Sequence, residues 1–190
     1  DHRDLHLSIR RQRQMCIRDN NFGIERAMMT TVHAYTSDQP LADAVRSDLR
    51  RSRSAVENII PNETWAPDYV AQLMPKFEGK ISGIAMNVPV ANGSCIDLTT
   101  EMTKMPTIED VNQSFQKSST SDLAGLVRYT EDPIVSSDAI GGGETMLFDS
   151  KATMIASEKL LKTVAWFDNG WGFASRILEL AESYTQLERA

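Results

Sequence analysis

Residues 27–35 constrain the fold most, because they predict a strand whose two faces differ in chemistry. Alternation places Thr31, His33 and Tyr35 on one face and Val32 and Ala34 on the other. Residues 36–55 follow as a long polar loop that we expect to turn helical at its end. The pattern therefore predicts an imidazole near the end of a strand, next to a polar loop.

His33 is the first candidate for chemistry, since an imidazole moves protons near neutral pH. The polar loop carries arginines that could hold an anionic substrate through forked hydrogen bonds, namely Arg50, Arg51 and Arg53. A base beside an anion cradle is the outline of an active site. Two structural alternatives stay open, because a lone strand histidine is often a satisfied structural residue and arginine clusters are usually solvated and paired with nearby acids.

The remaining patterns predict one domain of short helices and strands. The expected helices are 66–74 with Pro67 in the first turn, 107–117 with Thr107 as the cap, and 171–187, whose apolar residues recur at helical spacing. The expected strands are 81–88, 95–102, 126–129, 135–137, 145–148 and 161–167. Turn residues between 88 and 95 favour a hairpin of the strands on either side. The order of elements predicts an α+β fold, a mixed or antiparallel sheet covered by helices.

Composition excludes several classes of protein. The chain has 190 residues, of which 41% are hydrophobic and 24% charged, as is normal for a soluble globular protein. The net charge of −6 argues against a general nucleic-acid binder, and we expect no membrane partner because no apolar run is long enough to span a bilayer. Two cysteines make no disulfide framework, so a reducing, cytoplasmic compartment is expected.

The chain divides into two parts of different character. Residues 1–20 mix arginines with little amphipathic order. We interpret them as a doubtful or disordered segment outside the fold, or as a mistranslated or artificially added end; a basic arm for a partner is the alternative. Residues 21–190 read as one folded domain without repeats or long linkers.

Other candidate features carry weaker signals. Cys95 lies in a predicted strand, where an inert thiol is expected, and the glycines at 141–143 indicate a turn more than a phosphate loop. Asn169 either caps the last helix or aims its amide into a site. No G-x-G-x-x-G motif encodes a dinucleotide fold. No metal site is expected, because the histidines lack a ligand spacing: His2, His6 and His33.

Several segments of residues 22–190 resemble, in order and spacing, the C-terminal catalytic half of the phosphorylating glyceraldehyde-3-phosphate dehydrogenase family, including its erythrose-4-phosphate relatives. They are 22–25, 30–36, 48–51, 58–61, 88–89 with 97–98, 129–131, 135–138 and 166–169. The resemblance implies the fold of that domain and oxidation of an aldehyde such as a sugar phosphate. In that reaction a cysteine thiolate forms a thioester, NAD or NADP takes the hydride, and inorganic phosphate releases the product. It also implies a homotetramer, in which residues 35–55 pack toward a neighbouring subunit's cofactor.

The resemblance also assigns roles to individual residues. It implies that His33 is the general base, that Asn169 fixes the nicotinamide amide and that Phe173 flanks the nicotinamide ring. The positions that it implies for the two anion sites are Thr36, Asp38 and Arg53 for one, and Thr64 for the other, where inorganic phosphate binds.

Three departures from the family pattern change what the chain is expected to do. The position of the family's nucleophilic cysteine falls on His6, and the cofactor-binding N-terminal half is absent, so we expect a fragment that is inactive alone. Asn87 stands where the family has an arginine that serves both anion sites, and Trp65 stands where it has a glycine that faces phosphate. These changes predict a reshaped phosphate site and another aldehyde substrate, phosphorylated or not. The alternative is a non-catalytic assembly module derived from the same domain.

Overall fold

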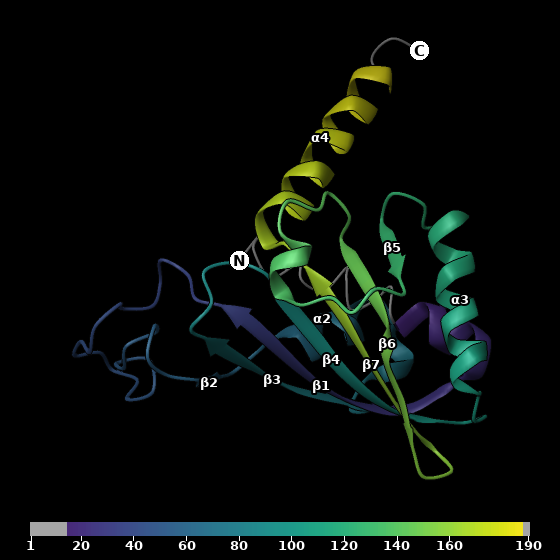
Figure 1. Cartoon of the computed structure of the whole chain (residues 1–190), viewed down its shortest axis with the longest axis horizontal. Helices are drawn as coiled ribbons and strands as arrows, with labels where there is room; N and C mark the ends of the chain where they lie inside the picture. Colours follow the sequence, from purple (N-terminus) through teal and green to yellow (C-terminus); the bar gives the residue numbers. More distant parts are fainter. Residues whose placement is uncertain (1–14, 188–190) are drawn as a thin grey trace.

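A computed structural model of the chain describes residues 15–187 (Figure 1). Residues 15–22 are helical, and the other elements follow in the order β1 Ile24–Ala34, β2 Ile60–Asn62, α2 Ala66–Leu73, η1 Pro75–Phe77, β3 Ile81–Val88, β4 Ser94–Met102, α3 Ile108–Thr120, β5 Val127–Thr130, η2 Ser136–Ala139, β6 Met146–Ala156, β7 Leu160–Phe167 and α4 Asn169–Leu187. The structure confirms the predicted α+β class with a mixed sheet.

Seven strands of the described chain form a single sheet in the order β2-β3-β1-β4-β7-β6-β5. β1 lies between β3 and β4, parallel to β3 and antiparallel to β4. The predicted hairpin of β3 and β4 is therefore wrong. The connection between them passes the end of β1, where the backbone N–H of Tyr35 donates to the carbonyl of Val90 at 3.1 Å, so the turn residues there build a crossover instead.

One face of the sheet carries the hydrophobic core. Side chains from β1, β4, β6 and β7 pack there against α2, α3 and the helix at residues 15–22. Phe115 of α3 stacks on Phe148 of β6 with ring centroids 3.8 Å apart, and both are fully buried. Burying two aromatic side chains in one stack is among the larger stabilising contributions available to a domain of this size.

Residues 15–20 belong to this packed face. Met15 and Ile17 are buried in the core, and the guanidinium carbon of Arg18 lies 5.9 Å from the centroid of the Phe115 ring. The boundary that we expected after residue 20 therefore falls inside a helix, and the expectation of disorder does not hold for residues 15–20. Its remaining part, residues 1–14 with His2 and His6, lies outside the described residues.

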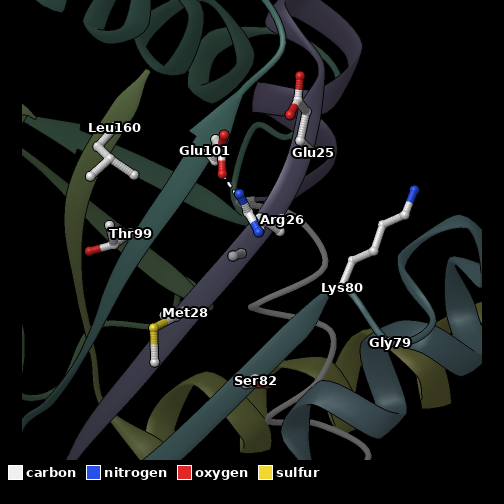
Figure 2. A pocket seen from close by; sticks show the side chains of 10 residues that line it. Glu25, Arg26, Met28, Gly79, Lys80, Ser82, Thr99, Glu101 and Leu160 are labelled. Carbon is white, nitrogen blue, oxygen red and sulfur yellow. Dashed lines mark hydrogen bonds and ion pairs between the residues drawn. The ribbon is translucent and has the colours of Figure 1, made fainter. Parts of the chain in front are cut away.

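The opposite face of the sheet is open. Met28 of β1, Ile84 of β3 and Leu160 of β7 are exposed on it, and ion pairs cross it between Asp97 and Lys162, at 2.7 Å, and between Arg26 and Glu101. Figure 2 shows the groove beside the second pair, with Arg26 reaching Glu101 on the neighbouring strand. An uncovered apolar strip bordered by charges is typical of a surface that another polypeptide covers.

Several local predictions are confirmed and others are corrected. Thr107 caps α3 in a capping box with Asp110, and Pro67 lies in the first turn of α2. The strand predicted at 135–137 is the short helix η2, because Asp138 accepts a hydrogen bond from the N–H of Val135 and closes a turn there. No helix forms at the end of the loop after β1, where side chains such as Ser52 and Asp48 bind the backbone instead.

α4 projects away from the sheet (Figure 1). Its apolar residues Ile177, Leu180 and Tyr184 are exposed, so the stripe recognised in the sequence has no cover within the described residues. Within residues 15–187, none of the helices combines the length and apolar character that crossing a membrane requires.

Candidate active site at the end of the central strands

His33 lies in a row of side chains that crosses four strands near the end of β1. In the parallel pair β1–β3 it faces Asn87, and on its other side the antiparallel register continues through Ser94 of β4 to Phe167 of β7. Residues paired in register point to the same face of a sheet. The row therefore sets an imidazole between an amide and an aromatic ring.

The imidazole is half-buried and has a defined orientation. Its ring meets the edge of Phe167 at a centroid distance of 6.0 Å and an interplanar angle of 78°. The backbone N–H of Ala34, the next residue, donates to the Ser94 hydroxyl at 3.3 Å. These contacts fix the end of the strand and the position of the ring. Because His33 is only half-buried, it also has access to solvent, as a proton-transfer group requires.

Two asparagines extend the row toward β2. Asn87 is buried, its Nδ2 lies 3.5 Å from the Ala34 carbonyl, and its Oδ1 accepts a hydrogen bond from Nδ2 of Asn62. Asn62 belongs to β2, which pairs with β3. The side of the site nearest β2 is therefore made of neutral amides.

Asp168 ties together the segments at the other side of the site. Its Oδ1 accepts from the N–H of Gly170 at 2.8 Å and of Trp171 at 3.0 Å, which caps α4, and its Oδ2 accepts from Gly141 N–H at 3.0 Å and from Asn92 Nδ2 at 2.9 Å. Burial alone would raise the pKa of Asp168, but these hydrogen bonds outweigh it and hold the pKa below its usual range. Asp168, and not Asn169, is thus the capping residue.

Asn169 and Phe173 occupy the first turns of α4, immediately after β7 and Asp168. Both are half-buried, and Asn169 comes two residues after Phe167, the ring that contacts His33. The two residues expected near a cofactor are therefore close in sequence to a residue that touches the expected base.

The loop after β1 holds Arg46, Arg51 and Arg53 in ion pairs. Asp38 pairs with Arg51, and Arg53 pairs with Asp43 at 3.2 Å. The hydroxyl of Thr36 accepts a hydrogen bond from the N–H of Asp38 at 3.4 Å, so these two predicted residues lie together. The alternative of a solvated, paired cluster describes these arginines well.

Thr64 and Trp65 precede α2. The Thr64 hydroxyl accepts a hydrogen bond from the N–H of Ala66 at 3.3 Å. Thr64 is half-buried and lies just before the start of the helix. The indole of Trp65 is 66% exposed and stands away from the core.

Neither cysteine suits the role of nucleophile. Cys95 pairs in register with Val32, so its side chain lies on the face opposite His33, and burial raises the pKa of its thiol to about 11. Burial also raises the pKa of Cys16. Across residues 15–187, no three His, Cys, Asp or Glu side chains cluster as metal ligands would.

An imidazole, a buried carboxylate and neutral amides at one end of an α+β sheet define a candidate acid–base site. Residues 13–169 match the family model described as "Glyceraldehyde 3-phosphate dehydrogenase, C-terminal domain", and the chain belongs to this family. The expected resemblance is thereby confirmed.

Bacterial relatives agree with this assignment. The chain is 46% identical to glyceraldehyde-3-phosphate dehydrogenase 2 of Streptomyces avermitilis over 162 residues, which are 85% of this chain and 48% of that protein. It is 47% identical over 163 residues to glyceraldehyde-3-phosphate dehydrogenase of Streptomyces coelicolor, again 85% of this chain and 48% of that protein. The Geobacillus stearothermophilus protein of the same name is 43% identical over 160 residues, 84% of this chain and 48% of that protein. The chain thus spans about half the length of the curated relatives it matches.

Sequence reasoning missed two members of the site. Asp168 could have been found, since an aspartate before Asn-Gly and a periodic apolar segment is a helix-capping signal. Asn62 carried no such signal, because its role depends on the pairing of β2 with β3.

Proposed function

We propose that this chain is the catalytic half of an NAD-dependent dehydrogenase that oxidises an aldehyde through a cysteine thioester. The observation that carries the proposal is the half-buried imidazole of His33, oriented by Phe167 and the end of β1, in a chain of this family. The nucleophilic cysteine and most of the cofactor site belong to polypeptide outside this chain.

His33 serves as the general base. It accepts the thiol proton, which generates the thiolate, and returns that proton to the alkoxide oxygen as the thiolate adds to the aldehyde carbon. It accepts the proton again from the hydroxyl of the adduct as the adduct is oxidised. NAD, or NADP, supplies the hydride acceptor when bound. Collapse of the adduct then leaves a thioester, and inorganic phosphate attacks its carbonyl carbon and expels the thiolate.

The residues at the start of α4 fit the cofactor that the family uses. A half-buried amide at Asn169 can hydrogen-bond a carboxamide, and the ring of Phe173 offers an apolar flank for a planar heterocycle. The capping bonds to Asp168 fix the first turn of the helix, and so position both side chains.

For phosphate groups we propose the residues that the family pattern indicates. Thr36, Asp38 and Arg53 would frame one anion site and Thr64 the other. The hydrogen bond between Asp38 and Thr36 supports the first grouping, and the position of Thr64 before α2 supports the second, since helix N-termini favour anions.

The open face of the sheet and the exposed stripe of α4 support assembly with other polypeptides. We propose a homo-oligomer, with the tetramer of the family as the expected state, located in the cytoplasm. These surfaces also favour the second candidate function, a non-catalytic assembly module.

The test is made on the complete gene product that contains this chain. We expect NADH formation with aldehyde, and a loss of kcat of roughly 100- to 10,000-fold in His33→Asn with little change in KM. Gln116→Ala on the exposed surface of α3 is the control and should retain full activity. An enzyme that keeps most of its kcat without the imidazole would contradict the role of His33, and a protein with no dehydrogenase activity would favour the assembly module.

A further inference from the structure

The connection between β3 and β4 is tied to the end of the site that carries the base. The backbone N–H of Ala34 donates to the hydroxyl of Ser94 at 3.3 Å, and the backbone N–H of Tyr35 donates to the carbonyl of Val90 at 3.1 Å. Both donors directly follow His33 in the chain. The connection therefore cannot move relative to the base without breaking these two hydrogen bonds.

Asn92, in the middle of this connection, reaches the other end of the site. Its Nδ2 donates to Oδ2 of Asp168 at 2.9 Å, and its Oδ1 accepts a hydrogen bond from the backbone N–H of Gly93 at 2.7 Å. A reversed amide would set an oxygen against the carboxylate and a donor against the N–H, so the two partners allow only this orientation. Asp168 is 2% exposed, and a hydrogen bond to a buried carboxylate is stronger than the same bond in water.

Gly93 restricts the position of Asn92. Its φ of +83° lies in the region that favours glycine, and a Cβ there would lie 2.2 Å from the carbonyl oxygen of Ser136. The backbone of the connection thus packs directly against η2, which limits how far Asn92 can move away from Asp168.

Asp168 links this contact to the end of the site proposed for the cofactor. One carboxylate oxygen accepts hydrogen bonds from the N–H groups of Gly170 and Trp171 at the start of α4, and the other accepts the bond from Asn92. Asn169, the residue proposed to hold the nicotinamide amide, lies between Asp168 and this capped turn. Because hydrogen bonds at both oxygens fix the plane of a carboxylate, the bond from Asn92 orients the cap and, with it, Asn169.

Asn92 is the firmer of two anchors at that oxygen. The other donor is the N–H of Gly141, at 3.0 Å. Gly141 is exposed and begins a run of three glycines, whose backbone has more freedom than that of the turn packed on η2.

We propose that Asn92 is a positioning residue of the dehydrogenase: through Asp168 it holds Asn169, and so the nicotinamide, at a set distance from His33. Oxidation of the adduct removes a hydride and a proton from one carbon–oxygen unit, so the groups that receive them must be aligned at the same time. This inference rests on the proposed dehydrogenase activity, and it adds the link that joins the two ends of the site.

The first test uses Asn92→Ala in the complete gene product that contains this chain. Binding of NAD and of NADP, measured by isothermal titration calorimetry, should weaken by about tenfold for the cofactor that the wild type uses, because Asn169 is no longer held. The value of kcat/KM for the cofactor should fall with it. KM for the aldehyde and for inorganic phosphate should stay within about twofold of the wild type, since their proposed sites do not depend on Asn169.

Asn112→Ala is the matched control. Asn112 is also half-buried and also joins two elements, since its Nδ2 donates to the Ser150 carbonyl at 3.2 Å and its Oδ1 accepts from the Thr153 hydroxyl at 2.8 Å. This variant should lose stability and keep its cofactor affinity, so an effect of weaker folding alone would appear in both variants.

Asn92→Asp gives a signature that a merely structural role would not produce. Its carboxyl group faces Oδ2 of Asp168, and two carboxylates at hydrogen-bond distance raise the pKa of one of them above its ordinary value of about 4. Below the raised pKa a shared proton restores the hydrogen bond, and above it the two charges repel. Cofactor affinity relative to the wild type should therefore be near one at about pH 5 and fall about tenfold by about pH 8. The other three donors to Asp168 are backbone N–H groups, which do not titrate.

The outcomes separate this inference from the proposed function. Cofactor binding by Asn92→Ala that is as tight as in the wild type overturns the role of Asn92 and leaves the dehydrogenase intact. Equal losses of affinity in Asn92→Ala and Asn112→Ala, or a ratio for Asn92→Asp that does not change with pH, overturn it as well. If Asn92→Ala does not fold, the pH series of Asn92→Asp decides alone. A wild-type protein that neither binds NAD or NADP nor oxidises an aldehyde overturns the proposed function and, with it, this inference.

Discussion

Removing the Asp168 carboxylate should destabilise the domain more than any single surface ion pair does. In Asp168→Ala, α4 loses its cap, at a cost of about 1 kcal/mol. The donors on Gly141 and Asn92 lose a buried acceptor, at about 1–2 kcal/mol each. The free energy of unfolding should therefore fall by about 3–5 kcal/mol, compared with 0–1 kcal/mol for an exposed ion pair.

The pH dependence of stability provides an independent check. Because the pKa of Asp168 is lower in the folded state than in the unfolded chain, its contribution is fully present above the unfolded value, about pH 4, and declines as the pH falls toward the folded value. Asp168→Asn cannot titrate, so its unfolding free energy should fall less steeply with acid than that of the wild type.

Urea-induced unfolding of the 190-residue chain, followed by circular dichroism, measures both effects. Asp138→Ala is the matched control, since its exposed carboxylate also accepts a backbone hydrogen bond, from Val135 at 2.8 Å, and its loss should cost less than about 1 kcal/mol. The reasoning fails if Asp168→Ala costs no more than Asp138→Ala, or if Asp168→Asn and the wild type share one acid profile.

Three further changes test the packing. Arg18→Met should raise the unfolding free energy by about 1–2 kcal/mol, because burial lowers the pKa of Arg18 to about 9 and an apolar side chain escapes that desolvation; a fall in urea midpoint would contradict this. Thr107→Ala should cost about 1 kcal/mol through loss of the α3 cap, visible as a lower urea midpoint, and an unchanged midpoint would count against the capping box. Gly93→Ala should cost more than about 2 kcal/mol, since φ is +83° and a Cβ would lie 2.2 Å from the carbonyl oxygen of Ser136; thermal unfolding with a near-normal midpoint would refute the close approach.

The features that the sequence predicted correctly are those that depend on residues close together in the chain. Alternation located β1 and the face of His33, and the caps at Thr107 and Pro67 located two helices. Each of these signals involves only a few neighbouring residues, so it determines the local backbone conformation without contacts from distant parts of the chain. The residue roles inherited from the family pattern, such as those of Thr64 and Phe173, stay predictions.

The pairing of strands and side chains that are distant in the sequence could not be predicted from the sequence pattern. A hairpin of β3 and β4 satisfied the local turn residues, and only the insertion of β1 between them excluded it. The bond between Asn62 and Asn87 likewise joins residues 25 positions apart through the pairing of β2 with β3. The particular acids that pair with Arg51 and Arg53 could not be predicted either, because no spacing rule distinguishes Asp38 and Asp43 from their neighbours.

The central place of β1 has a consequence for synthesis on the ribosome. Among the described strands β1 is encoded before both its neighbours, β3 and β4, so one of its edges cannot pair until residue 88 has been added and the other until residue 102. During that interval an alternating apolar strand presents at least one unpaired edge to the solvent. Holdase chaperones that bind extended apolar segments should therefore engage the nascent chain at β1, and release it once β4 emerges.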